Sequence, residues 1–251
     1  RMPEKEYIGE RVPQEGDYID EYGVNHGQGV KIGETVWAPV NCGYHATDYA
    51  YGKLYQWGRK YGQGYVGRLM GDDGYYSSEY ADASAPELIY GLVSLATGQS
   101  KDNENKFYYN SSEPKDWCSP QNDKIWNSGT EENPLKTEYD PCPDGWRIPT
   151  YAELDELNNN YSSWTANEYG QPGYCFSGST LYTEAVPSVF FPAAGCLLSF
   201  DGDAHERGYC GSYWSSRTNG TYAYYLLSLS TCVEMAYYSR AHGLSVRCVQ
   251  D

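Results

Sequence analysis

The sequence predicts an α+β chain built largely from short strands, and three observations lead to this fold class. With 251 residues and 40% hydrophobic side chains, the chain can bury one substantial core or two small ones. Short segments of alternating apolar and polar residues follow one another between Gly, Asn and Ser, most of them after residue 170. Two further segments, 86–96 and 151–159, carry the boundary signals of helices.

Residues 1–29 are polar and of mixed charge, and Gly16, Gly23 and Gly27 interrupt them. We expect an N-terminal arm with little core of its own, followed by a domain over 30–251. The first segment of that domain, 30–40, alternates enough to form one or two strands broken at Gly33. The aromatic-rich segment 48–60 is expected to be a packed strand or a short helix.

An insertion is predicted over 63–138, because this part is rich in Gly, Asp, Ser and Asn. Its one predicted helix covers 86–96, with Pro86 in the first turn and Gly98 beyond the end. Trp117 and Trp126 are expected to anchor the insertion onto the main body. The Gly-rich run at 62–67 lacks the Lys-Ser/Thr pair of a phosphate-binding loop, so we interpret it as an ordinary loop.

Thr150 and Glu153 have the spacing of a capping box, which predicts a helix from Tyr151 to about residue 159. Its buried side is expected to carry Leu154 and Leu157. The rest of the chain predicts strands at 173–176, 189–193, 211–216, 222–229, 231–237 and 244–249.

The net charge of −16 argues against a nucleic-acid partner and against anionic membrane surfaces. No apolar run approaches the roughly 20 residues of a membrane span, so we expect no membrane insertion of this segment. Tyrosine is unusually common, with 28 Tyr against 5 Phe. A recognition surface and a β-rich protein that uses Tyr for strand propensity explain this equally well.

Eight cysteines are present without a C-x-x-C pair, so the usual zinc and redox spacings are missing. Asp201, Asp203 and Glu206 form the best acidic cluster, but a calcium ion takes about 6–8 oxygen ligands. We interpret the cluster as a solvated acidic turn and expect no metal and no cofactor. His45, His205 and His242 accompany no signature of nucleophilic catalysis, so no enzyme is expected.

Six motifs occur in a characteristic order: WAPVN at 37–41, GKLYQW at 52–57, CPDGWRIPT at 142–150 with Glu153, FPAAG at 191–195, YWSS at 213–216 and SVRCV at 245–249. Together they resemble the major paralogous domain (FISUMP) family of bacterial surface lipoproteins. They are particularly similar to the subset that serves as variable proteins of diversity-generating retroelements. The similarity covers 30–62 and 139–251 and leaves out the insertion.

The resemblance implies a C-type-lectin-like fold with a twisted, mostly antiparallel sheet and two helices, whose last strands display a binding face. It implies a disulfide between Cys142 and Cys248, and leaves the other six cysteines unassigned. It also implies a cell-surface or extracellular protein, lipid-anchored through a removed N-terminal segment. The expected partner is a protein or glycan on another cell, or on a phage or host surface.

In the retroelement subset, variable codons derive from AAC or AAT, which restricts the residues they can encode. The residues that fit this alphabet, and that we expect to bind ligand, are Tyr209, Cys210, Ser212, Tyr222, Tyr224, Tyr225, Tyr237, Tyr238, Ser239 and His242. Strand alternation predicts that only one of Tyr224 and Tyr225 is exposed. Tyr237 and Tyr238 lie near the loop to the last strand, so we expect both to be exposed. Trp146, Trp214 and Phe190 are expected to form the buried scaffold.

Two other functions are retained as alternatives. One is a structural or adhesive subunit of a bacterial surface fibre that uses the same fold as a spacer or tip. The other, more remote, is an oxidoreductase similar to formylglycine-generating enzymes, which share the broad fold and use cysteines in catalysis. In that case Cys210 and Cys232 would be the candidate cysteines.

Overall fold

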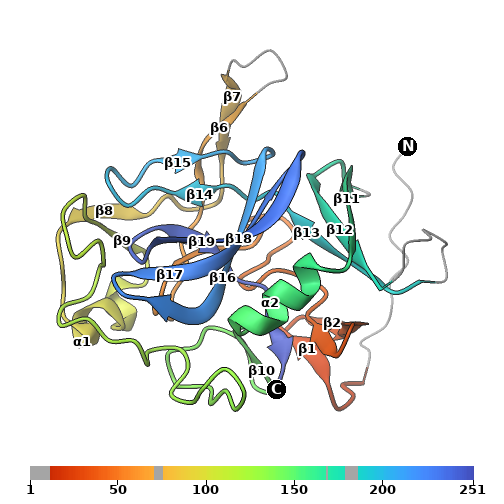
Figure 1. Ribbon diagram of the computed structural model, residues 1–251. Helices are drawn as coiled ribbons and strands as arrows, with labels where there is room; N and C mark the ends of the chain where they lie inside the picture. The colour runs from red at the N-terminus through yellow and green to blue at the C-terminus, as the bar shows by residue number, and fades with distance from the viewer. Residues whose placement is uncertain (1–11, 71–75, 168, 179–185) are drawn as a thin grey trace.

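The computed structural model describes residues 12–70, 76–167, 169–178 and 186–251, and these are mostly β (Figure 1). Strand makes up 39% and helix 7%, arranged as several antiparallel sheets with two short α-helices. The expected antiparallel strands are therefore confirmed, and two short helices are present. The described residues contain more strand and less helix than the α+β prediction implied, because most of one predicted helix is a strand.

The largest sheet has the order β15-β14-β19-β16-β17-β18, and β5 also pairs with β19. Strands β16, β17 and β18 form an antiparallel meander, whereas β16 and β19 run parallel. The bounds are β5 (Leu54–Gln56), β14 (Cys196–Leu197), β15 (Ala204–His205), β16 (Cys210–Asn219), β17 (Tyr222–Leu229), β18 (Cys232–Ser239) and β19 (Gly243–Ser245).

Smaller sheets surround this one. A four-stranded sheet has the order β10-β20-β4-β3, and a three-stranded sheet joins β11, β12 and β13. Their bounds are β3 (Val30–Ile32), β4 (Thr35–Trp37), β10 (Trp146–Arg147), β20 (Val249–Gln250), β11 (Tyr161–Ala166), β12 (Pro172–Ser177) and β13 (Ser188–Pro192). Three pairs complete the set: β1 (Asp17–Ile19) with β2 (Asn25–Gln28), β6 (Val66–Met70) with β7 (Tyr76–Ala81), and β8 (Glu87–Tyr90) with β9 (Lys106–Tyr109).

The N-terminal segment is more than an arm, since its described part forms the β1–β2 hairpin and contributes Tyr18 to the core. The ring of Tyr18 is 1% exposed and meets Trp146 edge to face at 5.2 Å. The indole Nε1 of Trp146 donates a hydrogen bond to the carbonyl of Asp17 at 3.3 Å. The expectation of little core here was wrong, because the hairpin supplies the side chains that cover Trp146.

Helix α2 (Tyr151–Asn158) follows the prediction closely. The hydroxyl of Thr150 accepts a hydrogen bond from the Glu153 N–H, and the carboxylate of Glu153 accepts one from the Thr150 N–H at 2.7 Å. Leu154 and Leu157 are both buried in a core cluster with Leu226 of β17. The helix thus lies against the β16–β18 meander (Figure 1).

The predicted helix over 86–96 was wrong. Residues Glu87–Tyr90 form β8 instead and pair in parallel with β9, and only the short α1 (Leu95–Gly98) is helical. Gly91 has φ +105, a conformation that interrupts any continuous helix here. Gly98 lies inside α1, and a Cβ there would come within 2.1 Å of the Trp117 ring. A short 3-10 helix follows at Lys101–Asn103.

The two tryptophans of the insertion act as anchors, as expected. Both are fully buried. The indole Nε1 of Trp117 donates to the carbonyl of Trp57 at 2.6 Å, and that of Trp126 donates to the carbonyl of Arg59 at 3.2 Å. The insertion is therefore fastened to the segment that follows β5. Trp146 and Trp214 are buried as predicted, but Phe190 is only half-buried, and its neighbour Phe191 takes the core position.

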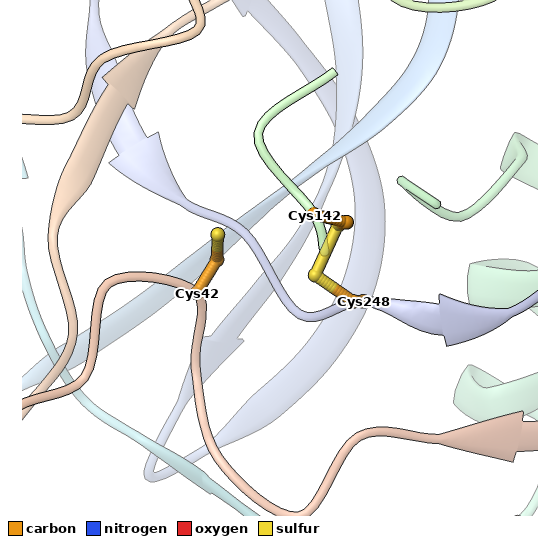
Figure 2. Close-up of side chains that lie close together, drawn as sticks. All are labelled: Cys42, Cys142 and Cys248. Atoms are coloured by element: carbon orange, nitrogen blue, oxygen red, sulfur yellow. A yellow bond between two sulfur atoms is a disulfide. The ribbon is translucent and has the colours of Figure 1, made fainter. Parts of the chain in front are cut away.

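The disulfide between Cys142 and Cys248 is present (Figure 2). It joins the segment before β10 to the residue before β20, across 106 positions of sequence. Cys42 lies beside it, and the three sulfur atoms are within 4.8 Å of one another. Burial raises the pKa of Cys42 to about 12, which favours the protonated thiol at neutral pH.

Candidate ligand-binding face

The pleat of strands β16–β18 divides the predicted site residues between two faces of the sheet. Along β17, Tyr225 points to the side opposite Tyr222 and Tyr224. Cross-strand pairs share a face, so Tyr237, opposite Tyr224, joins the first group and Tyr238, opposite Ala223, joins the second. We call the side with Cys210, Ser212, Tyr225 and Tyr238 the pocket face, and the side with Tyr222, Tyr224, Tyr237 and Ser239 the helix face.

The pocket face lines a hollow of about 430 Å³. Five of the ten predicted residues line it: Tyr209, Cys210, Ser212, Tyr225 and Tyr238. The remaining lining residues are Cys196, Leu198, Phe200, His205, Glu206, Leu227 and Leu229. Strands β14, β15 and the loops around them therefore close the pocket opposite the meander.

Stacked aromatic rings form one wall of the pocket. Tyr225 and Tyr238 lie nearly parallel with centroids 6.0 Å apart, and Tyr225 meets Trp214 edge to face at 5.9 Å. Tyr225 is 8% exposed, whereas Tyr238 is 37% and Tyr209 49% exposed. The buried rings thus hold the exposed ones in place, which is how rigid aromatic side chains serve binding at low entropic cost.

His242 was predicted to contact ligand, but it is 3% exposed and lies under Tyr238 with ring centroids 3.6 Å apart. Among the described residues neither of its ring nitrogens has a hydrogen-bond partner. Burial lowers its pKa to about 3, so the imidazole is neutral at physiological pH. His242 therefore supports Tyr238 and is not itself a contact surface.

Cys210, Ser212 and Ser239 are also buried. The Cys210 sulfur lies 3.4 Å from the Ser212 hydroxyl, and burial raises the pKa of the Cys210 thiol to about 12. A thiol held protonated is a poor nucleophile, which argues against a catalytic role for Cys210. The prediction of ligand-binding residues used only the residue types that variable codons can encode. It did not consider which side of a strand each residue faces, so it could not distinguish these buried residues from the exposed tyrosines.

Glu206 lines the pocket, although the sequence analysis placed it in a solvated acidic turn and not among the ligand-binding residues. It lines the pocket with a left-handed backbone, φ +67, which is rare for a residue with a side chain. Its carbonyl accepts hydrogen bonds from the N–H groups of Tyr209 and Cys210, both at 2.9 Å. This turn therefore holds the Glu206 backbone at the edge of the pocket that its side chain and the aromatic wall line. The available signal is its position shortly before Tyr209, the first of the predicted ligand-binding residues.

The acidic turn beside the pocket brings Asp201, Asp203 and His205 together, with possible ligand atoms within 4.8 Å of one another. Asp201 already accepts a hydrogen bond from the Asp203 N–H at 2.9 Å. Three donors fall short of the set that calcium requires. The interpretation as a solvated acidic turn stays a prediction.

The helix face carries a second tyrosine cluster. Tyr224 meets Tyr151 of α2 edge to face at 4.9 Å, and Tyr237 contacts Tyr222 at 5.6 Å. Cations border this cluster, since Arg217 lies over the rings of Tyr151 and Tyr224 at 5.2 and 5.4 Å. Tyr237 is the most open member, at 56% exposed, while Tyr222 and Tyr224 are half-buried.

The insertion borders this second cluster. The Lys115 ammonium lies 5.8 Å from the Tyr222 ring centroid, and the Lys115 carbonyl accepts a hydrogen bond from the Ser239 hydroxyl at 2.7 Å. Arg240, at the end of β18, reaches Asp123 at 2.5 Å. The insertion therefore packs against the open end of the meander, a placement that the sequence did not reveal.

Within the described part of the chain, no helix has both the length and the apolar character needed to cross a membrane. Comparison of the sequence with protein-family models and with curated proteins, and of the structure with solved structures, finds no match.

Proposed function

We propose that this chain is a non-catalytic binding module that presents the tyrosines of β16–β18 to a protein or glycan ligand outside the cell. The observation that carries the proposal is the pocket itself. Its exposed rings, Tyr209 and Tyr238, line a 430 Å³ hollow, a size within the usual range for ligand sites, and the buried Tyr225 and His242 pack against Tyr238.

The residues that stabilise the fold differ from those that are exposed for binding. Trp146, Trp214 and the Cys142–Cys248 disulfide are buried, whereas Tyr209, Tyr237 and Tyr238 are exposed. Exposed side chains can then change at small cost, typically within about 0.5 kcal/mol of unfolding free energy. This is the arrangement expected of a C-type-lectin-like variable protein of the FISUMP type, anchored at the cell surface. The confirmed disulfide is consistent with that resemblance.

Diversification by a retroelement is the finer part of the proposal, and it is tested on DNA. The locus is sequenced from several isolates, and codons 196–243 are searched for adenine-specific differences and for a nearby template copy. We expect differences at the exposed Tyr209, Tyr237 and Tyr238 more often than at the buried Cys210 and Ser212. An unchanging tail without a template copy would leave a protein of fixed specificity.

Binding is tested on an array of glycans and of bacterial, phage and host surface proteins. The Tyr238→Ala and Tyr237→Ala variants are compared with Tyr90→Ala, a matched control that removes a 61% exposed tyrosine of the insertion. We expect Tyr238→Ala to lose at least about tenfold in affinity for an array hit with little change in Tm, as for other aromatic anchors. Equal binding by all three variants would contradict the proposal.

One observation favours the alternative of a surface-fibre subunit. Strand β18 lies at one edge of the largest sheet, and it begins with the exposed free thiol of Cys232. An unpaired edge can accept a strand from another chain. Sedimentation over a wide concentration range distinguishes the two functions, because a fibre subunit assembles as concentration rises and a monomeric binding module does not.

A further inference from the structure

We propose that the pocket binds a guanidinium group, supplied by an arginine side chain on the surface of a protein partner. This inference rests on the proposed binding function and specifies its ligand chemistry. The rings of Tyr209, Tyr225 and Tyr238 and the side chain of Glu206 line the same hollow. Among the described residues that line it there is no Lys and no Arg, so the carboxylate has no cation within the lining.

The chain itself contains an occupied example of this chemistry. Arg207 is fully buried, and its guanidinium lies over the rings of Tyr65 and Tyr51, 3.9 and 4.8 Å from their centroids. Its two Nη atoms meet the two carboxylate oxygens of Asp82 at 2.9 and 3.0 Å. Two tyrosine faces and one carboxylate therefore surround a guanidinium in this protein, together with the Ala194 carbonyl, which accepts from Nε at 3.4 Å.

A second example shows that the combination is not confined to tyrosine. The guanidinium of Arg240 lies 4.9 Å from the Trp57 ring centroid and pairs with Asp123. The pocket offers the same elements without the arginine. Arginine suits them better than lysine, because its planar fork stacks on a ring and meets a carboxylate with two parallel hydrogen bonds.

The charge of the site also favours a cationic ligand. Burial is the main cause of the raised pKa values of Cys210 and Tyr238, and the negative charge of Glu206 adds to both. The field of this carboxylate thus extends over the pocket wall. The neighbouring Asp201 and Asp203 and the net charge of −16 further favour a cationic group over an anionic one.

The test uses the full chain and a matched pair of ligands, N-acetylarginine amide and its neutral isostere N-acetylcitrulline amide. Binding is followed by NMR through the ring signals of Tyr209 and Tyr238, which are assigned from their loss in Tyr209→Phe and Tyr238→Phe variants. We expect saturable shifts of both rings with the arginine ligand, at roughly millimolar affinity for a single side chain, and at least about tenfold weaker binding of citrulline.

Glu206→Gln is expected to lower arginine affinity about tenfold, to the level of citrulline, with the Tm unchanged. Glu34→Gln, at a side chain that is 90% exposed, is the control and is expected to leave binding unchanged. Equal binding of the two ligands, no effect of Glu206→Gln, or no saturable shift would each overturn the inference.

The two proposals fail separately. An array hit that depends on Tyr238, such as a neutral glycan, together with no arginine binding would overturn the guanidinium inference and support the binding function. Arginine binding with no array hit that depends on Tyr238 would support the pocket chemistry and count against the proposed function.

Discussion

At the scale of single residues, burial separates side chains that the sequence presents as equivalent. Tyr225 and Tyr238 have the same chemistry, yet one is 8% and the other 37% exposed. His242 completes their stack from below. Its imidazole has no hydrogen-bond partner among the residues that the structure describes, and burial penalises its charged form. That penalty makes the stability of this region depend on pH.

The His242 pKa gives the direction of this dependence. The unfolded chain binds a proton at His242 near pH 6.5, whereas the folded chain does so only near pH 3. Between these values the unfolded state holds more protons, so acidification lowers the free energy of unfolding, by on the order of 1 kcal/mol per pH unit. We expect His242→Phe to lose less stability than the wild-type protein between pH 7 and pH 5 in urea titrations.

The stability of the wild-type protein must be compared with that of His242→Phe, because Asp116 changes stability with pH in the opposite direction. Burial raises its pKa to about 6, so the folded state binds the extra proton and gains stability as the pH falls through that value. This contribution is common to both proteins and cancels in the difference. Parallel stability curves for wild type and His242→Phe would show that His242 does not remain neutral in the folded protein.

At the scale of elements, α2 depends on its capping box and covers part of the helix face through Tyr151 and Tyr224. The box satisfies two N–H groups that the first turn would otherwise leave without partners. Arg147 adds to it, because its Nη2 lies 2.6 Å from the Glu153 carboxylate.

We expect Thr150→Ala to lower the free energy of unfolding by about 1–2 kcal/mol, since the hydroxyl that accepts from the Glu153 N–H is lost. Thr150→Ser is the control, because serine keeps the hydroxyl and caps at least as well. Chemical denaturation of the three proteins measures the difference. If serine and alanine cost the same, the loss comes from the packing of the buried methyl group and not from the cap.

At the scale of the whole molecule, the Cys142–Cys248 disulfide connects the segment before α2 to the end of the chain. In the chain-entropy model, closing a loop of 106 residues stabilises the folded state by about 4–5 kcal/mol, and measured values are often nearer 2–4. We expect the Cys142→Ala, Cys248→Ala double variant to lose stability in this range.

Reductant provides the check on this prediction. Dithiothreitol is expected to destabilise the wild-type protein and to leave the double variant unchanged, as measured by Tm. Cys42→Ala serves as a control for the removal of a buried sulfur from the same cluster. A reductant effect that persists in the double variant would show that another cysteine pair stabilises the protein.

Local patterns accounted for many of the elements. The T-x-x-E spacing placed α2, and alternation placed β17 at the bounds it occupies, because caps and strand pleats depend on residues close in sequence. The disulfide pairing came from the family resemblance and not from local physics. The helix expected over 86–96 was lost because β8 pairs with β9, a partner about 20 residues further along the chain.

By itself, the sequence determined the capped helix, most of the C-terminal strands and the residues from which a binding face can be built. The tertiary structure alone decided which of those residues are exposed. Alternation predicted opposite sides for Tyr224 and Tyr225, but only the packing shows that Tyr225 is buried while Tyr238, on the same face, is 37% exposed, and that Glu206 lines the pocket from outside the meander. The reason is physical: exposure depends on what packs against each face, and those neighbours are distant in sequence.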